Sequence, residues 1–318
     1  MIFHYLKIAF RNLCKHKTQN IISIIGLAVG LLCFCVCIYC SRFVESTDHC
    51  FANHDGIAEL NLYDGKADRY FSGSPVPLAE DLRTWALGET EAISSVTYPR
   101  ERPYYVELSP EKTLPYELET IEIDTCYNKI FTPEMVAGHW KMASQSLNSI
   151  ILSQSMAIKI FGNAESAIGK HMTLMRRLNT SPESTPKTGG IVYTIQAVMK
   201  DIPLNNSLDF MQNIDMLTVN DSEGLLQSSK RHNMTGANTY VLLSPQTTCT
   251  DLEKQFSKRD YTYTLYGEAY TVTASSMGAR LKKQGASYLG LVTGTVGTLI
   301  LLVGLINFFH FLIGSFFS

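Results

Sequence analysis

The stretch IISIIGLAVGLLCFCVCIYC, residues 21–40, decides the architecture of this chain of 318 residues. It carries no charged residue, and at about 1.5 Å per helical residue its length matches a hydrocarbon core of roughly 30 Å. A cleaved signal peptide is the alternative, but its apolar region is only about 7–15 residues long and ends at an A-x-A-like site. The stretch therefore predicts a membrane-spanning helix over residues 19–43.

A second apolar run follows near the other end of the sequence. Residues 289–317 carry no charge, and the run is longer than one bilayer thickness needs, which a tilt or a projecting end accommodates. We therefore expect a second span within residues 287–318. The chain is predicted to be a membrane protein with two transmembrane helices flanking a domain of residues 46–285.

Basic residues before the first span predict its orientation. Residues 1–40 contain no Asp or Glu, and their four cations are Lys7, Arg11, Lys15 and Lys17. Such a cluster stays cytoplasmic by the positive-inside rule, although three cations at residues 280–283 oppose this orientation. Because the first helix usually dominates, we expect a multi-pass protein of the cell inner membrane with residues 46–285 in the periplasm.

Residues 1–18 are expected to form a cytoplasmic amphipathic helix. Four apolar residues recur at helical spacing, opposite the basic ones: Phe3, Leu6, Phe10 and Leu13. This pattern is typical of a helix that lies in the membrane interface. The lipid bilayer is therefore an expected partner.

Charge and cysteine usage narrow the function classes. Residues 41–287 hold all 29 acidic residues and 23 basic ones, so the middle of the chain is mildly acidic. A nucleic-acid-binding domain would need a basic stripe, and no nucleic-acid partner is expected.

Only Cys50, Cys126 and Cys249 would face the oxidising side, so a single disulfide among them stays open, but a disulfide framework is not expected. The C-x-C-x-C run at residues 33–37 points its thiols in different directions and predicts no metal site.

Residues 46–285 are predicted to fold as a mixed α+β domain with one lobe inserted into another. Alternation and β-branched residues indicate strands at 57–63, 92–98, 103–108, 116–124, 190–199, 211–218, 238–244 and 269–275. Helices are expected after Pro77, from Ser153 to a stop at Gly162, and after a cap at Thr250. Residues 178–190 are expected to be a hairpin tip. The predicted core includes Ile151, Leu152, Ile160, Phe161, Ile195, Val198 and Val241.

Catalytic motifs are not found in the sequence. The stretch GNAESAIGKH, residues 162–171, is a near miss to a phosphate-binding loop, because six residues separate its glycines and His171 replaces the Ser or Thr that holds Mg²⁺. No nucleophile elbow occurs, and the histidines lack ligand-like spacing. His310 lies within the second apolar run and is expected to reach the membrane interface. We expect no enzyme, no cofactor and no metal.

Several segments resemble the FtsX/MacB-type permeases of ABC transporters. The opening LKIAFRNLCKHKTQNIISIIGLAVGL is similar to the family's basic helix and first span, and residues 123–140 and 148–174 are similar to elements of the MacB-like periplasmic core domain. The run from 193 to 216 resembles the strand and turn that follow, with Asp201, Pro203 and Ser207 in order. LILLVGLINFFHF resembles the second span. Ala197, where the family has glycine, and the ending INFFHFL depart from the pattern.

The resemblance implies a permease of the mechanotransmission type, in which a cytoplasmic ATPase drives a conformational change of the periplasmic domain. It implies export of peptides, lipoproteins or antimicrobials. Its implied partners are the ATPase subunit, a second permease protomer and a periplasmic adaptor. Family members continue with a cytoplasmic segment and further spans, so the resemblance covers the N-terminal portion and we expect a partial permease subunit.

Two other function classes compete with this hypothesis. The sensor half of a histidine kinase or chemoreceptor has the same order of span, outer domain and span. Downstream spans and a neighbouring ATPase gene would favour the permease, whereas a coiled coil and a kinase domain would favour the sensor. A membrane-anchored hydrolase is disfavoured, since no nucleophile, base or metal cluster can be assembled from the sequence.

Glycines in the two apolar runs predict where the spans pack. Helices in lipid associate through close backbone approach, which small residues four apart permit. Such pairs are Gly26 with Gly30 and Gly290 with Gly294, while Gly297 and Gly304 lie seven apart. Glycine is also common in membrane helices for other reasons. We expect that leucine at both Gly26 and Gly30 disrupts packing while insertion remains normal.

Overall fold

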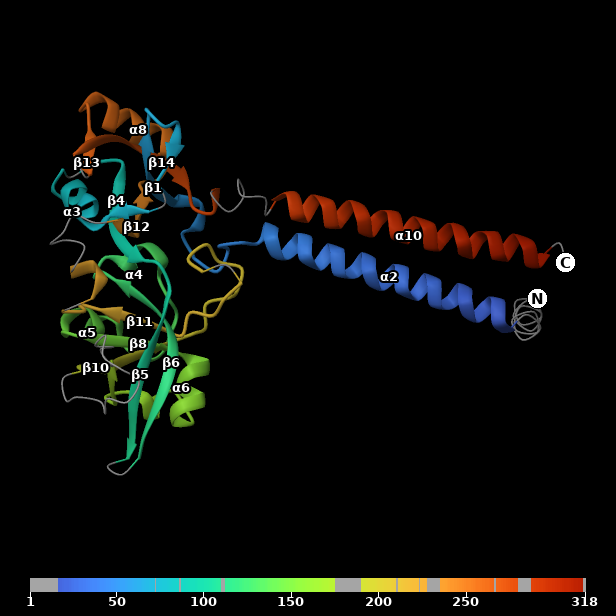
Figure 1. Ribbon diagram of the computed structural model, residues 1–318, viewed down its shortest axis with the longest axis horizontal. Coiled ribbons are helices and arrows are strands. Elements are labelled where there is room, and N and C mark those ends of the chain that lie inside the picture. Colours follow the sequence, from blue (N-terminus) through green and yellow to red (C-terminus); the bar gives the residue numbers. More distant parts are fainter. Residues whose placement is uncertain are drawn as a thin grey trace. The chain divides into compact units, whose positions relative to one another are not determined.

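The computed structural model describes residues 17–71, 73–85, 87–109, 112–174, 190–209, 211–222, 224–227, 235–265, 267–279 and 287–316. Contacts divide the chain into two compact units. One contains two long helices, α2 (Lys17–Glu45) and α10 (Ser287–Phe316), which we call the helix pair. The other is the sheet domain, Asp48–Ala279 (Figure 1).

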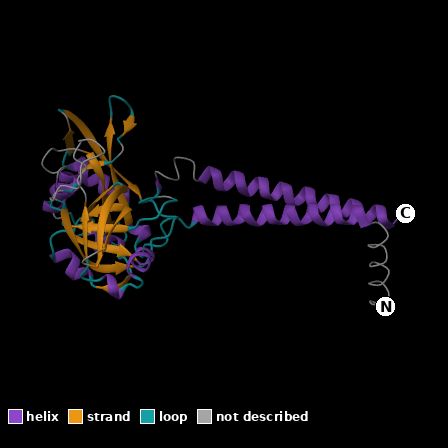
Figure 2. Ribbon diagram, turned by 60° about the horizontal axis from the view of Figure 1, so that its bottom comes forward, coloured by secondary structure: helices purple, strands orange, loops and turns teal. Residues whose placement is uncertain are grey.

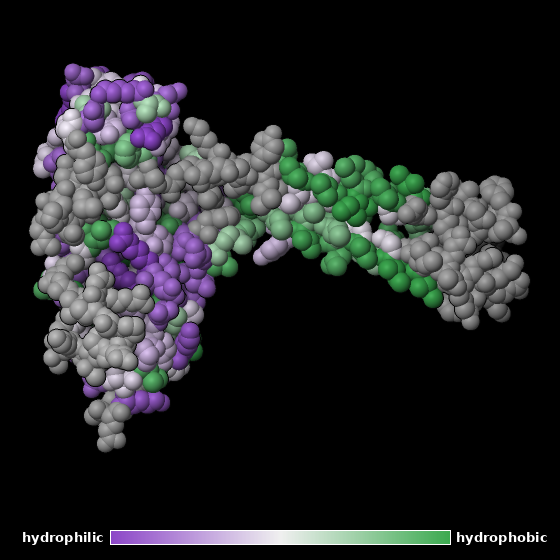
Figure 3. Space-filling view, in the orientation of Figure 1, coloured by the Kyte–Doolittle hydropathy of each residue, from purple (hydrophilic) through white to green (hydrophobic). Residues whose placement is uncertain are grey.

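Helix α2 contains a segment long and apolar enough to cross a membrane, Ile24–Glu45. Its apolar side chains are exposed rather than packed in a protein core; Leu32, for example, is 65% exposed. Figure 3 shows hydrophobic surface along the helix pair and mostly hydrophilic surface over the sheet domain.

The second expected span is not established by the described residues. Helix α10 is 30 residues long, but the apolar segment counted over its described side chains is Leu291–Ile306, shorter than a span needs. That segment is as exposed as α2, since Leu291 is 69% exposed. The expected amphipathic helix over residues 1–18 lies almost wholly outside the described residues.

The described residues of the sheet domain form one sheet of fourteen strands, and Figure 2 shows the strands together in one body. The strands before the middle of the domain are β1 (Ile57–Asp64), β2 (Arg69–Tyr70), β3 (Ser74–Pro75), β4 (Thr90–Thr97), β5 (Arg100–Ser109), β6 (Lys112–Ile123) and β7 (Met135–Gly138). The later strands are β8 (Ser149–Ser153), β9 (His171–Leu174), β10 (Ile191–Met199), β11 (Met216–Val219), β12 (Thr235–Leu243), β13 (Thr262–Leu265) and β14 (Glu268–Ser276).

Pairings within this sheet close into a ring. In order, the ring runs β11, β8, β10, β9, β5 and β6, and β6 pairs again with β11. From β6 the sheet continues as an open part through β4, β12, β1, β14 and β13. The middle of the sheet domain's sequence thus makes the ring, and its first and last strands make the open part. A single residue pair, Val96 with Ile123, joins β4 to β6.

Short helices cover the sheet: α3 (Val76–Thr84), α4 (Tyr127–Phe131), α5 (Trp140–Gln145), α6 (Gln154–Phe161) and α8 (Cys249–Lys258). Two 3₁₀ turns occupy His54–Gly56 and Glu165–Ala167. Helix α6 begins as expected, because the Ser153 side chain accepts a hydrogen bond from the Met156 amide, and it ends at Gly162 with φ of 87°. Pro77 lies in the first turn of α3 as predicted.

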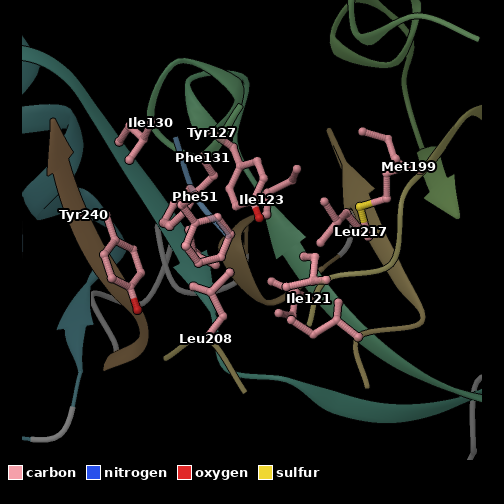
Figure 4. Packing of buried hydrophobic residues seen from close by; sticks show 14 of the residues in the cluster. Phe51, Ile121, Ile123, Tyr127, Ile130, Phe131, Met199, Leu208, Leu217 and Tyr240 are labelled. Atoms are coloured by element: carbon pink, nitrogen blue, oxygen red, sulfur yellow. The ribbon is translucent and has the colours of Figure 1, made fainter. Parts of the chain in front are cut away.

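The three largest hydrophobic clusters among the described residues form most of the core. One lies under the open part and draws on segments before residue 94 and after residue 240. Another lies in the ring and comes wholly from residues 104–216. The third contains residues of both, including Phe51, Phe131 and Tyr240 (Figure 4). There Phe131 stacks on Tyr127 at 4.5 Å between ring centroids and meets Phe51 edge-on at 5.0 Å. This third cluster unites ring and open part in one unit.

The structure confirms the α+β class and most predicted strands. Strand 211–218 is largely wrong, because β11 begins only at Met216. The predicted core residues are buried except Phe161, which is half-buried at the end of α6. Residues 175–189 lie outside the described residues, but the strands on either side pair antiparallel, Leu174 opposite Ile191, as a hairpin requires.

The predicted cap at Thr250 is wrong. Helix α8 begins at Cys249, and Thr248 is its N-cap residue. The Thr248 side chain accepts from the Asp251 amide while the Asp251 carboxylate accepts from the Thr248 amide, which is a capping box. Thr250 with Glu253 has the same spacing, but Glu253 accepts a hydrogen bond from the Ala274 amide of β14. Tertiary structure therefore selects the earlier threonine.

Candidate functional site

Helices α2 and α10 pack along a seam of glycines. Three contacts run in opposite directions along the two helices, so the helices are antiparallel. A Cβ at Gly30 would lie 3.4 Å from the Ile300 carbonyl oxygen, and one at Gly304 would lie 3.7 Å from the Gly26 carbonyl oxygen. A Cβ at Gly297 would lie 2.6 Å from the Cys37 Cβ. Close approach of this kind is what associates helices in lipid.

The predicted glycines contribute unequally to this seam. Gly30 faces α10, whereas a Cβ at Gly26 or Gly294 would meet nothing within 4 Å. The side-chain surroundings of Gly290 are outside what the structure describes. Gly297 makes the tightest approach. Of the basic residues predicted to set orientation, Lys7, Arg11 and Lys15 lie outside the described residues, and Lys17 begins the described part of α2.

The seam leads to a prediction with a matched control. Gly297→Leu is expected to separate the helices, because its Cβ would overlap the Cys37 Cβ and Sγ. Gly294→Leu adds the same side chain three residues away, where a Cβ would meet nothing within 4 Å. In detergent, protease resistance of the helices should fall for Gly297→Leu alone. Equal loss of resistance in both variants would contradict the seam.

A second candidate site lies where the sheet domain begins. Asp48, its first residue, is buried and has a φ of 70°. Its carboxylate accepts hydrogen bonds from the Ser207 amide, at 2.6 Å, and from the Ser207 hydroxyl. Its own amide donates to the Asn205 carbonyl oxygen at 2.9 Å. Three hydrogen bonds therefore fix the start of the domain to the segment that follows β10.

The other end of the sheet domain meets the same carboxylate. Gly278 has a φ of 74°, and a Cβ there would lie 2.7 Å from the Asp48 Oδ2 and 3.2 Å from the Ser207 Oγ. Only glycine combines this backbone conformation with so close an approach. We call Asp48, Ser207 and Gly278 the terminal clamp. In it, the points at which the chain enters and leaves the domain lie in close contact.

The clamp explains part of the segment singled out in the sequence. Asp201 accepts a hydrogen bond from the Ser155 amide in the first turn of α6, which favours a negative charge. The Pro203 carbonyl accepts from the Asn206 side chain, which in turn accepts from the Asp209 amide. Ser207 then binds Asp48. The segment thus ties a helix of the ring to the start of the domain.

Buried charges cluster at the junction of ring and open part. They border a cavity of about 220 Å³, smaller than the roughly 300–1,000 Å³ of small-molecule sites. Asp124, at its edge, accepts from the Arg83 guanidinium, the Ser94 hydroxyl and the Ser95 amide. These donors come from the open part, and Asp124 follows β6 of the ring. The ion pair therefore bridges the weak β4–β6 connection.

A more deeply buried network lies beside it. Arg102 of β5 pairs with Glu122, which is 1% exposed, and its Nη1 lies 3.7 Å from the Asp221 Oδ2. Glu122 also accepts from the Leu226 amide, and Asp221 accepts from the Tyr193 hydroxyl at 2.8 Å. Burial raises the pKa of Glu122, and Arg102 opposes that rise. Burial and the neighbouring Asp221 raise the pKa of Tyr193.

These groups bond mainly to one another and to the backbone. Among the described residues, no group of three or more His, Cys, Asp and Glu side chains could hold a metal ion. The carboxylates of Asp124, Glu122 and Asp221 accept hydrogen bonds from guanidinium, hydroxyl and amide donors. Gly162, in the near miss to a phosphate-binding loop, ends helix α6 instead of opening a loop before a helix. His171 is exposed and hydrogen-bonds Thr194.

Comparison with known proteins found solved structures with a similar fold. No protein-family model matches the chain, and no curated protein matches it. It is similar to a domain of a protein described as a permease from Porphyromonas gingivalis, at 21% identity and a TM-score of 0.52, covering 71% of this chain and 93% of that one. The two share a fold. The resemblance drawn from the motifs is confirmed at the level of the fold.

Two further solved structures have lower TM-scores. The periplasmic region of MacB from Actinobacillus actinomycetemcomitans has a TM-score of 0.47 at 13% identity, covering 76% of this chain and 97% of that one. The extracellular domain of the noncanonic ABC-type transporter YknZ from Gram-positive bacteria has 0.40 at 10% identity, covering 69% and 99%.

Proposed function

We propose that this chain is part of the permease subunit of an ABC transporter of the mechanotransmission type. The observation that carries the proposal is a sheet domain with the fold of a permease domain, joined directly to a helix able to cross a membrane. The ordered sequence motifs support the same assignment. The proposed role is binding and movement rather than catalysis, with no cofactor.

In this proposal both long helices cross the inner membrane and the sheet domain is periplasmic. A cytoplasmic ATPase moves the helix pair, and the movement enters the sheet domain at the terminal clamp. The clamp suits this role because Asp48 follows α2 by only three residues and is hydrogen-bonded to Asn205 and Ser207 in the segment after β10. Peptides, lipoproteins or antimicrobials are the proposed export substrates, with a second protomer and a periplasmic adaptor as further partners.

The topology is tested with reporter insertions in the full chain. Alkaline phosphatase is active only outside the cytoplasm and is inserted after Lys187. Green fluorescent protein is fused before residue 1. We expect an active phosphatase and a fluorescent N-terminus. An inactive phosphatase at Lys187, with an intact protein in the membrane, contradicts the periplasmic placement.

The permease role needs a second experiment, because a sensor half would have the same topology. The full-length product of this gene is co-expressed with an ABC-transporter ATPase, encoded by a neighbouring gene where there is one, and both are placed in lipid vesicles. We expect ATP hydrolysis to differ from that of the ATPase alone, and Gly278→Ala to reduce the difference. An unchanged rate with the chain present would favour the sensor.

A further inference from the structure

The segment between β10 and β11 carries exposed apolar side chains next to the terminal clamp. We call residues 202–214 the clamp loop; all but residue 210 are described. Leu204 is 38% exposed and Met211 is 58% exposed. The Met211 amide donates to the Leu204 carbonyl oxygen at 2.8 Å, so the backbone at these two residues is held together. The loop therefore presents a small, fixed apolar tip.

The rest of the clamp loop is free of exposed charge. Its one ionisable residue is Asp209, which is half-buried and whose Oδ2 is fully buried. Burial raises the pKa of Asp209. The other exposed side chains among its described residues are Pro203 and the amides Gln212 and Asn213. A surface of apolar and amide groups can enter the polar headgroup layer of a membrane. It carries no charge, so the large cost of moving a charge into lipid does not arise.

Chain connectivity limits how far this loop can be from the end of α2. Glu45 is the last residue of α2, and Asp48 is bonded to Asn205 and Ser207 of the clamp loop. Three residues span at most about 11 Å, since consecutive Cα atoms are 3.8 Å apart. The limit holds whatever the orientation of the sheet domain. A loop tied this closely to the end of a span lies near the membrane surface.

We propose that the clamp loop is a lipid contact, with Leu204 and Met211 inserted into the headgroup layer of the bilayer beside α2. This inference rests on the proposed function, because it needs α2 to cross the membrane. Insertion removes apolar area from water without bringing a charge into lipid. It gives the sheet domain a second attachment to the membrane, next to the clamp that receives the movement of the helices.

A protein partner fits these observations less well. A stable protein interface buries about 800 Å² on each partner, far more than two side chains at a loop tip provide. Other exposed apolar residues, such as Leu147 and Val192, have no bond to the segment that follows α2. They serve as matched controls, because Leu147 is 68% and Val192 53% exposed.

Photocrosslinking in lipid vesicles tests the proposal on the full chain. The photoreactive residue p-benzoylphenylalanine replaces Leu204, Met211, Leu147, Val192 or Leu31, one at a time, and the protein is placed in phosphatidylethanolamine–phosphatidylglycerol vesicles. All five positions are exposed, so the fold should persist, and circular dichroism checks it. Lipid adducts are quantified by mass spectrometry. We expect at least fivefold more adduct at Leu204 and Met211 than at Leu147 and Val192.

Crosslinking at Leu31 distinguishes failure of the proposed function from failure of the lipid contact. Leu31 lies in α2 and should form adducts if α2 crosses the membrane; no adduct there would overturn the proposed function. Adducts at Leu31 with Leu204 and Met211 equal to the controls would overturn the lipid contact alone. A crosslink from Leu204 or Met211 to a second copy of the chain would instead assign the clamp loop to a protein interface and also overturn it.

Discussion

Arg102→Met is expected to lower the free energy of unfolding by about 3–5 kcal/mol at neutral pH, the usual cost of removing one partner from a buried ion pair. The variant leaves Glu122 and Asp221, which are 1% and 3% exposed, without their guanidinium. Methionine fills much of the space of the arginine stem, so the loss reports mainly the unpaired carboxylates. Urea unfolding of the detergent-solubilised chain, followed by the fluorescence of Trp85 and Trp140, measures it.

The loss should depend on pH in a definite direction. Without Arg102, burial holds the pKa of the Glu122 carboxyl in the folded protein above its unfolded value, which is about 4. The folded state then binds more protons than the unfolded state, so the variant loses stability as pH rises through this range. The difference from the wild type should be smallest near pH 4 and full at pH 7. A difference independent of pH would assign the loss to packing.

Two further variants control the experiment. Lys200→Met removes one partner of an exposed pair, since the Lys200 and Glu134 side chains are 63% and 71% exposed, and should change stability by less than about 1 kcal/mol. Adding Glu122→Gln and Asp221→Asn to Arg102→Met removes the buried charges and should restore part of the loss. A triple variant as unstable as Arg102→Met would contradict the electrostatic cause.

Local sequence patterns predicted the helices and strands better than they predicted the terminal clamp and the glycine seam. Alternation and β-branched or aromatic residues identified β1, β4, β5, β6, β10, β12 and β14, and one uncharged stretch identified α2. Strand β8 was missed, because SIILS is buried on both faces and shows no alternation. The ring was also missed, since its closure by β6 and β11 depends on pairings between residues about 96 apart, such as Thr120 with Met216.

The terminal clamp shows why sites of this kind escape sequence reasoning. Asp48 and Ser207 are 159 residues apart, and neither belongs to a catalytic or metal-binding pattern. The available signal was the order of Asp201, Pro203 and Ser207, which marked the segment without revealing its partner. The glycine seam was open to prediction because helical spacing is local, yet Gly26 and Gly30 differ in facing α10 and periodicity alone did not separate them.

Gly278→Ala is expected to lower the free energy of unfolding by roughly 2–4 kcal/mol, against about 1 kcal/mol for Gly267→Ala. Both glycines have positive φ, 74° and 82°, so alanine meets the same backbone penalty at each. At Gly267 a Cβ meets nothing within 4 Å, whereas at Gly278 it lies 2.7 Å from the Asp48 Oδ2. The difference between the two variants isolates the contact with the clamp.

That contact is costly only while Asp48 cannot move away. Its carboxylate is held by the Ser207 amide and hydroxyl, so Ser207→Ala should loosen it and reduce the cost of Gly278→Ala. Residues in one hydrogen-bonded network commonly show coupling of about 0.5–3 kcal/mol in a double-mutant cycle. Two results would show that the Asp48 side chain can move away at little cost. One is additive losses of unfolding free energy in the cycle, and the other is equal losses for Gly278→Ala and Gly267→Ala. Asp48, Ser207 and Gly278 could then not join the two ends of the sheet domain rigidly, and the movement of α2 would have to enter the domain elsewhere.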